Sequence, residues 1–196
     1  MPSTLGCAIL GLLARAELTG YQISKSMKGA HDYFWTARHS QIYAELGKLA
    51  ANGLVSDTVI EGPGPRVTRR YAITGTGLHA LQEWLVARPA PSVERDEFIV
   101  RVWSMWLLEP ESARSMVSNH REQRRHRLEI YQLVEQEMLQ EGAPQPNTPV
   151  FAAYAALRAG LSYERHRIAW CDWLLEALSD DAPSRAQNWA VRSSMR

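Results

Sequence analysis

Residues 40–73 read SQIYAELGKLAANGLVSDTVIEGPGPRVTRRYAI, and this stretch decides the fold of the first half of the chain. Its apolar residues recur every three or four positions over 42–49, a spacing typical of one face of a helix. Ser40 is a suitable cap for the start of this helix. Asn52 and Gly53 end it, because both residues tolerate the left-handed conformation that follows a helix.

A β-hairpin is predicted directly after that helix. Residues 54–60 are rich in β-branched side chains, and residues 66–73 alternate between two faces, as strands do. Residues 62–65 read GPGP, a turn that neither a helix nor a strand tolerates. The second strand carries three arginines, so the hairpin has a basic edge.

Helices are predicted on both sides of this stretch. Ser3 or Thr4 caps a first helix that runs to about residue 15, and Thr19 caps a second one after a short turn at 16–18. Thr74 caps a helix that ends before the proline-containing linker at 87–92. The order of three helices followed by a hairpin is that of a winged helix-turn-helix, which we expect over residues 1–88.

Beyond the linker the sequence predicts long helices over 94–108, 110–141 and 148–178. The last of them repeats apolar residues at alternating spacings of four and three, which is typical of a coiled-coil seam. A partner chain is the simplest way to cover this seam, so we expect a homodimer. The fold class is therefore mainly α, with a helical dimerisation domain at 93–179 and a flexible tail at 180–196. The seam residues are Val150, Tyr154, Leu157, Leu161, Glu164, Ile168, Cys171, Leu175 and Leu178.

Composition excludes several classes of protein. The chain has 196 residues, of which 45% are hydrophobic and 22% are charged, and these fractions are typical of globular proteins. No apolar run is long enough to span a membrane, and the two lone cysteines indicate a reducing compartment, so we expect a cytoplasmic protein. The net charge of +1 conceals an asymmetry, since residues 1–88 carry +3 and residues 89–196 carry −2. The basic half is the predicted reader of DNA.

The predicted DNA contacts follow from the geometry of this fold. The first turn of the third helix enters the major groove, where Gln41 suits the donor and acceptor pair of adenine. The arginines of the hairpin contact the adjacent backbone, and residues at the start of the second helix are placed to bind a phosphate. The candidate residues are Thr19, Tyr21, His39, Ser40, Gln41, Tyr43, Lys48, Arg66, Arg69 and Arg70. Each of these assignments has a structural alternative. Ser40 could serve only as a helix cap, Tyr43 could pack in the core, and the arginines could protect a strand edge from aggregation.

Three runs of sequence resemble the PadR family of bacterial transcriptional regulators. The first run comprises AILGLL from residue 8 and TGYQI from residue 19, the second is IYAELGKLAANGLV from residue 42, and the third is RRYAITGTG from residue 69. The C-terminal helices resemble those of the longer PadR subfamily. The resemblance implies a homodimer that binds an inverted-repeat operator in double-stranded DNA, usually as a repressor. It also implies that some members release DNA when they bind phenolic acids or planar aromatic drugs.

An effector site is predicted less directly. Trp103 and Trp106 lie three positions apart on one helix and either pack in a core or interface or form a slot that stacks a planar ligand, with Arg101 near its carboxylate. No histidine spacing matches a zinc site, and we expect neither a metal nor a cofactor. The alternative function is a small-molecule carrier or an enzyme on a winged-helix scaffold. An enzyme is disfavoured, because no catalytic motif or phosphate-binding glycine loop is found.

Overall fold

The computed structural model describes residues 1–28, 38–60, 68–89, 96–140 and 142–179, and it divides into two compact units. The N-terminal unit comprises Met1–Ser92 together with Glu141–Leu157, and the C-terminal unit comprises Val93–Gln140 together with Arg158–Arg196. The segment 141–157, which was predicted to lie in the dimerisation domain, is thus grouped with the N-terminal winged helix-turn-helix. Turn residues 62–65, Arg66 and the predicted tail 180–196 lie outside the described residues.

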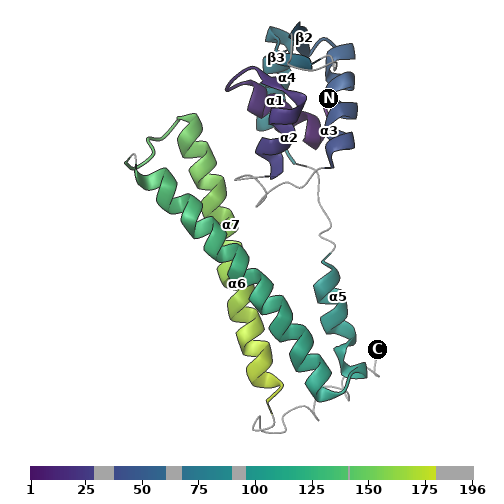
Figure 1. Cartoon of the computed structure of the whole chain (residues 1–196), viewed down its shortest axis with the longest axis vertical. Helices are drawn as coiled ribbons and strands as arrows, with labels where there is room; N and C mark the ends of the chain where they lie inside the picture. The colour runs from purple at the N-terminus through teal and green to yellow at the C-terminus, as the bar shows by residue number, and fades with distance from the viewer. Residues whose placement is uncertain (29–37, 61–67, 90–95, 141, 180–196) are drawn as a thin grey trace. The chain divides into compact units, whose positions relative to one another are not determined.

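The N-terminal unit contains the predicted helices and hairpin (Figure 1). One element is added, because residues 18–19 form a short strand that pairs with the hairpin, with Leu18 opposite Tyr71. The three strands are antiparallel in the order β1-β3-β2. The elements are α1 (Thr4–Leu13), β1 (Leu18–Thr19), α2 (Gly20–Lys28), α3 (His39–Ala51), β2 (Val55–Ile60), β3 (Thr68–Ile73) and α4 (Gly75–Val86).

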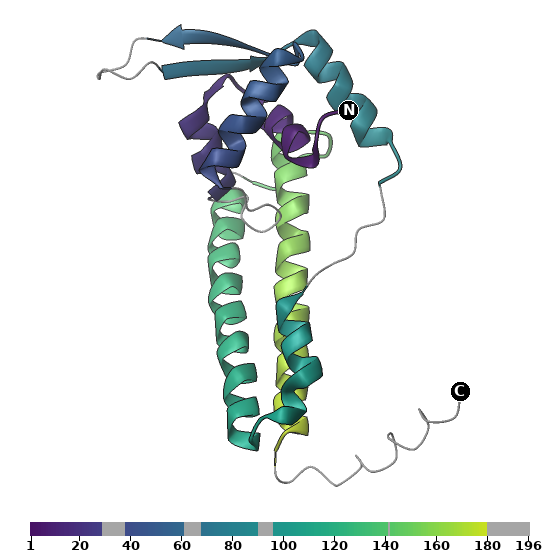
Figure 2. The ribbon, with the colours of Figure 1, turned by 90° about the vertical axis from the view of Figure 1, so that its right-hand side faces the viewer.

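One apolar core holds this unit together. The predicted stripes of α1 and α3 meet in it, and Tyr71 of β3 closes it from the sheet. Thr74 caps α4 as predicted, since its hydroxyl accepts the amide hydrogen of Gly77 at 3.0 Å. The same hydroxyl donates to the carbonyl of Gly53 at 2.7 Å and so joins the end of α3 to the start of α4. Figure 2 shows β2 and β3 extending side by side past α3.

The C-terminal unit is built from α5 (Glu97–Ser104), the 3-10 turn η1 (Met105–Leu107), α6 (Pro110–Gln140) and the greater part of α7 (Pro149–Ala177). Helix α5 begins three residues later than predicted, because Asp96 caps it by accepting from the amides of Phe98 and Ile99. No helix of the described residues has the length and apolar character needed to cross a membrane.

The heptad seam of α7 is covered differently from the prediction. Leu157, Leu161 and Cys171 are buried within the single chain. Cys171 packs with Phe98 of α5 and Val117 of α6 in the core of the C-terminal unit. This part of the seam is therefore buried within one chain, whereas Val150, at the start of the seam, is 53% exposed. Large apolar side chains remain exposed on α5 and η1, and also on α6 at Leu133 and on α7 at Trp173.

Candidate nucleic-acid interface

The start of α3 is organised differently from the prediction, because Arg38 and not Ser40 precedes the helix. The backbone amide of Arg38 donates to Oε1 of Gln41 at 2.9 Å, so the Gln41 side chain reaches back to close the first turn. Ser40 lies inside this turn and is exposed. The side-chain oxygen that Gln41 would offer to adenine already accepts one bond from the backbone, whereas its amide nitrogen is left for an outward contact.

The outward face of α3 carries the other predicted readers. His39, Ser40 and Tyr43 are exposed, and the rings of His39 and Tyr43 lie 4.7 Å apart between centroids. On the opposite face Ile42 and Leu46 are fully buried, which fixes the rotation of the helix. The periodicity of the helix thus turns the predicted DNA-contacting residues toward solvent.

The start of α2 lies against the same part of α3. Thr19 Oγ1 accepts from the amide of Gln22 at 3.2 Å, and Gln22 Oε1 accepts from the amide of Thr19 at 2.8 Å. This reciprocal cap leaves Tyr21 at the surface with 67% of its area exposed. Gly20 touches Tyr43 so closely that a Cβ atom on it would lie 2.7 Å from the tyrosine ring. Only glycine therefore allows Tyr43 its observed position.

The hairpin arginines differ in their surroundings. Arg69 is bound to Asp57 of the neighbouring strand, with Nη1 2.6 Å from Oδ2. Arg70 is exposed in the middle of β3, opposite Thr58 and Thr19, and forms no ion pair with any described residue. Arg70 is therefore more available than Arg69 to bind a phosphate, because Arg69 is already ion-paired with a carboxylate.

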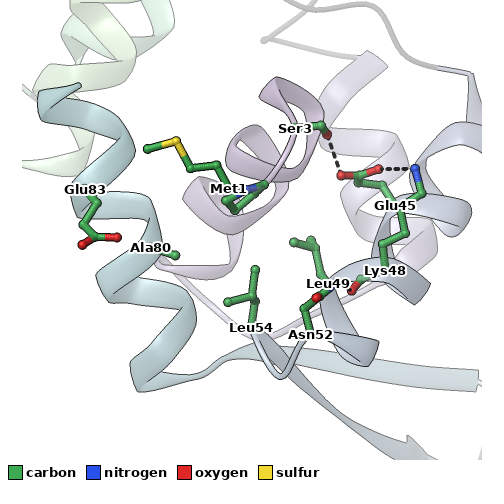
Figure 3. A pocket seen from close by; sticks show the side chains of 10 residues that line it. Met1, Ser3, Glu45, Lys48, Leu49, Asn52, Leu54, Ala80 and Glu83 are labelled. Carbon is green, nitrogen blue, oxygen red and sulfur yellow. Dashed lines mark hydrogen bonds and ion pairs between the residues drawn. The ribbon is translucent and has the colours of Figure 1, made fainter. Parts of the chain in front are cut away.

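Glu45 points away from the exposed face of α3 that carries Tyr43. Its Oε1 accepts from the hydroxyl of Ser3 at 2.5 Å, and Oε2 lies 3.3 Å from Nζ of Lys48 (Figure 3). The carboxylate is buried, whereas the Lys48 side chain remains exposed. These contacts border a cavity of about 440 Å³ between the ends of α1, α3 and α4. Glu45 thus links α3 to Ser3, the cap of α1, and forms an ion pair with Lys48.

The predicted effector residues lie in the C-terminal unit. Trp103 is 79% exposed and Trp106 78% exposed, so neither packs in a core of the described chain. Arg101 is paired with Glu97 one turn earlier, with Nη2 2.6 Å from Oε1. Among the described residues no group of three or more His, Cys, Asp or Glu side chains is arranged to hold a metal ion.

Sequence reasoning missed the buried charges between the helices of this unit. Glu164, an interruption of the heptad pattern, pairs with Arg124 of α6 at 3.2 Å. Nε2 of His120 accepts from Nε of Arg124 at 3.2 Å, and the imidazole stacks on Phe98 with centroids 3.5 Å apart. Burial, then the charges of Arg124 and Arg167, lower the pKa of His120 to about 4. The only signal in the sequence is a charged residue at a position that is apolar in its repeat.

Two family models match the chain. The model described as the transcriptional regulator PadR-like family matches residues 9–83, and the model described as the virulence activator alpha C-terminal domain matches residues 94–179. The two matches fall on the winged helix-turn-helix and on the long helices that follow it.

Relatives extend the match over nearly the whole chain. The negative transcriptional regulator PadR of Bacillus subtilis is 30% identical over 177 residues, which cover 89% of this chain and 97% of that protein. The crystal structure of Bacillus subtilis PadR in complex with operator DNA covers 90% of this chain and 100% of its own, at 28% identity and a TM-score of 0.81. Its complex with p-coumaric acid covers 90% and 99%, at 29% identity and a TM-score of 0.75.

Proposed function

Because this chain belongs to the PadR-like family of transcriptional regulators, we propose that it binds operator DNA as a homodimer and represses transcription. The observation that carries the proposal is the exposed first turn of α3, where Tyr43 touches Gly20, next to Thr19, which pairs with Arg70 of the basic strand β3. The name of the Bacillus subtilis relative, a negative regulator, favours repression. Since the family consists of regulators, we propose no catalytic activity, and nothing favours the carrier or enzyme alternative.

We assign the DNA contacts as follows. Ser40 and the free amide nitrogen of Gln41 face base edges in the major groove, because the first turn of a recognition helix enters it. The remaining candidates contact the DNA backbone and fix the register of the protein on the duplex. These backbone contacts are Thr19, Tyr21, His39, Tyr43, Lys48, Arg66, Arg69 and Arg70.

The homodimer follows from the form of the proposed operator. Two copies related by a two-fold axis read the two halves of an inverted repeat, with half-sites about 34 Å, or one DNA turn, apart. We place the partner on the apolar face of α5 and η1, where Trp103 and Trp106 are exposed. Large exposed apolar patches mark interaction surfaces.

A ligand completes the proposal. The structure of Bacillus subtilis PadR with p-coumaric acid shows that a relative of this chain binds a phenolic acid. We propose that a phenolic acid or another planar aromatic compound lowers the affinity of this protein for its operator. Such a release requires only that the ligand binds the DNA-free protein more tightly than the DNA-bound protein.

Binding of the upstream promoter fragment at increasing salt tests the proposal. We expect the logarithm of affinity to fall linearly with the logarithm of salt concentration, with a slope of about −0.9 for each neutralised phosphate. The substitution Arg70→Ala removes a phosphate contact and should make the slope shallower by about one such step for all sequences. Gln41→Ala should instead reduce the preference for the operator over unrelated DNA.

Controls separate these roles from folding. Arg101→Ala removes an exposed cation from the other unit and should leave both slope and preference unchanged. Thermal unfolding of Gln41→Ala measures the loss of its capping role independently of DNA. Operator affinity that does not change between low and moderate salt would contradict the proposed function.

A further inference from the structure

Arg167 of α7 is a buried cation with unused hydrogen-bond donors. The residue is 8% exposed, and neither Nε nor Nη2 has a hydrogen-bond acceptor in the described part of the chain. Nη2 lies 2.8 Å from Oδ2 of Asp96, but the contact lacks the geometry of a hydrogen bond. Buried guanidinium donors are nearly always satisfied, so this arrangement calls for an explanation.

Aromatic rings hold the guanidinium in place. Its carbon lies 4.9 Å from the centroid of Trp170 and 6.0 Å from the centroid of Phe98. A planar cation between rings is fixed in orientation, and the fork of its N–H groups is therefore presented in a defined direction. Asp96 is fixed as well, because its Oδ1 accepts from the amides of Phe98 and Ile99 and leaves Oδ2 toward Arg167.

A groove of about 710 Å³ opens at this site, within the range of small-molecule sites. It lies in the C-terminal unit between α5 and α7, and Arg167 and Asp96 form part of its wall. Ile99 and Val100 add an aliphatic side, and Tyr163 and His166 add flat rings. A planar apolar body with one polar end matches this lining.

We propose that this groove binds a planar aromatic carboxylate, whose carboxylate replaces Oδ2 of Asp96 on the Arg167 guanidinium. A carboxylate accepts two parallel N–H bonds from an arginine fork, and this would satisfy the donors that Asp96 leaves unused. The ring of the ligand lies between Tyr163 and the aliphatic side chains of α5. Asp96 retains its role as the cap of α5 through Oδ1.

An anionic ligand has to compete with the carboxylates at the groove. Glu97 also lines the groove, but its carboxylate is held by Arg101 through bonds of 3.1 and 2.6 Å. Asp96 is then the carboxylate that opposes the ligand directly. Removing its charge should strengthen binding, and removing the charge of Arg167 should abolish it.

The effect of this ligand on DNA binding rests on the proposed function. The proposed ligand site is the groove beside Arg167 and not the surface around Trp103 and Trp106. Binding itself is measured without DNA. Titration calorimetry of the full-length protein with p-coumarate and with its uncharged methyl ester is the experiment. We expect p-coumarate to bind at least about tenfold more tightly than the ester, as loss of a hydrogen-bonded charge contact implies.

Four variants sharpen the test. Arg167→Gln should weaken p-coumarate binding at least about tenfold, and Arg167→Lys should fall between it and wild type because lysine lacks the fork. Asp96→Asn, which still caps α5, should tighten binding about threefold or more, since an opposing charge is removed. Arg165→Gln removes an exposed cation from the same helix two residues away and should change nothing.

The outcomes are distinct. Unchanged binding by a folded Arg167→Gln variant overturns the inference, as does binding that is lost on Trp103→Ala instead. If Arg167→Gln does not fold, Asp96→Asn decides, and weaker or equal binding overturns the inference. A wild-type protein that binds operator but no p-coumarate refutes this site and leaves the proposed DNA binding intact.

Discussion

At the scale of single residues, the contact between Gly20 and Tyr43 makes the sharpest prediction. A Cβ atom on residue 20 would lie 2.7 Å from the ring of Tyr43, so Gly20→Ala has to displace the ring. If the Tyr43 hydroxyl binds a phosphate, we expect a loss of about 1.5 kcal/mol, or roughly tenfold in operator affinity. Gel-shift titration of the operator measures the affinity.

Gly11→Ala is the matched control, because nothing lies within 4 Å of the Cβ that it adds inside α1. It should leave DNA binding unchanged and stabilise the fold by about 0.5–1 kcal/mol, since glycine has more conformational freedom to lose in a helix. Operator affinity of Gly20→Ala equal to that of wild type would mean that Tyr43 makes no contact of value.

Residues show most clearly where sequence reasoning ends. The pattern of α3 predicts which side chains face outward, because burial follows the 3.6-residue period. It does not predict that Gln41 bonds the amide of Arg38, since Ser40 is the better cap by residue type. The bond between Glu45 and Ser3 joins residues 42 positions apart, and only tertiary packing creates it.

At the scale of elements, the pairing of α6 with α7 depends on buried charge. Arg124 and Glu164 are 3.2 Å apart, and the carboxylate side chain is almost fully buried. We expect Glu164→Leu alone to lower the free energy of unfolding by about 3 kcal/mol or more, because it leaves a buried cation without its partner. Chemical denaturation followed by circular dichroism measures the change.

The double variant Arg124→Met with Glu164→Leu tests the cause. Replacing both charges by apolar side chains of similar volume should restore stability to near that of wild type or above it. Arg165→Leu, on an exposed position of the same helix, should have little effect. A double variant as unstable as the single one would show that the helices depend on packing volume at this position and not on charge balance.

The seam of α7 illustrates what an element's sequence contains. The 4-3 spacing correctly predicts a long helix with a buried face, because a helix that packs against any apolar surface needs apolar residues at this spacing. It does not say whose side chains cover the face. In the structure α5 and α6 of the same chain supply them around Cys171, and a charged residue at position 164 is compatible with burial because Arg124 lies opposite.

At the scale of the whole molecule, the proposed dimer depends on the apolar side chains that the single chain leaves exposed. Trp103, Trp106 and Leu107 are all at the surface of α5 and η1. Aromatic residues in such patches are typical centres of binding energy. We expect Trp103→Glu combined with Trp106→Glu to give monomers, because two desolvated carboxylates would face the partner. Light scattering at micromolar concentration measures the mass.

Loss of the dimer should also be visible on DNA. A monomer engages one half-site only, so the full operator should lose about a hundredfold or more in affinity, whereas an isolated half-site should be bound as before. Val86→Glu, an exposed position on α4 of the other unit, is the control and should remain dimeric with full affinity. A double variant that stays dimeric would place the partner on another surface. If it is monomeric yet binds the full operator as tightly as wild type, each copy reads its half-site independently, and the inverted repeat is not recognised by a two-fold dimer.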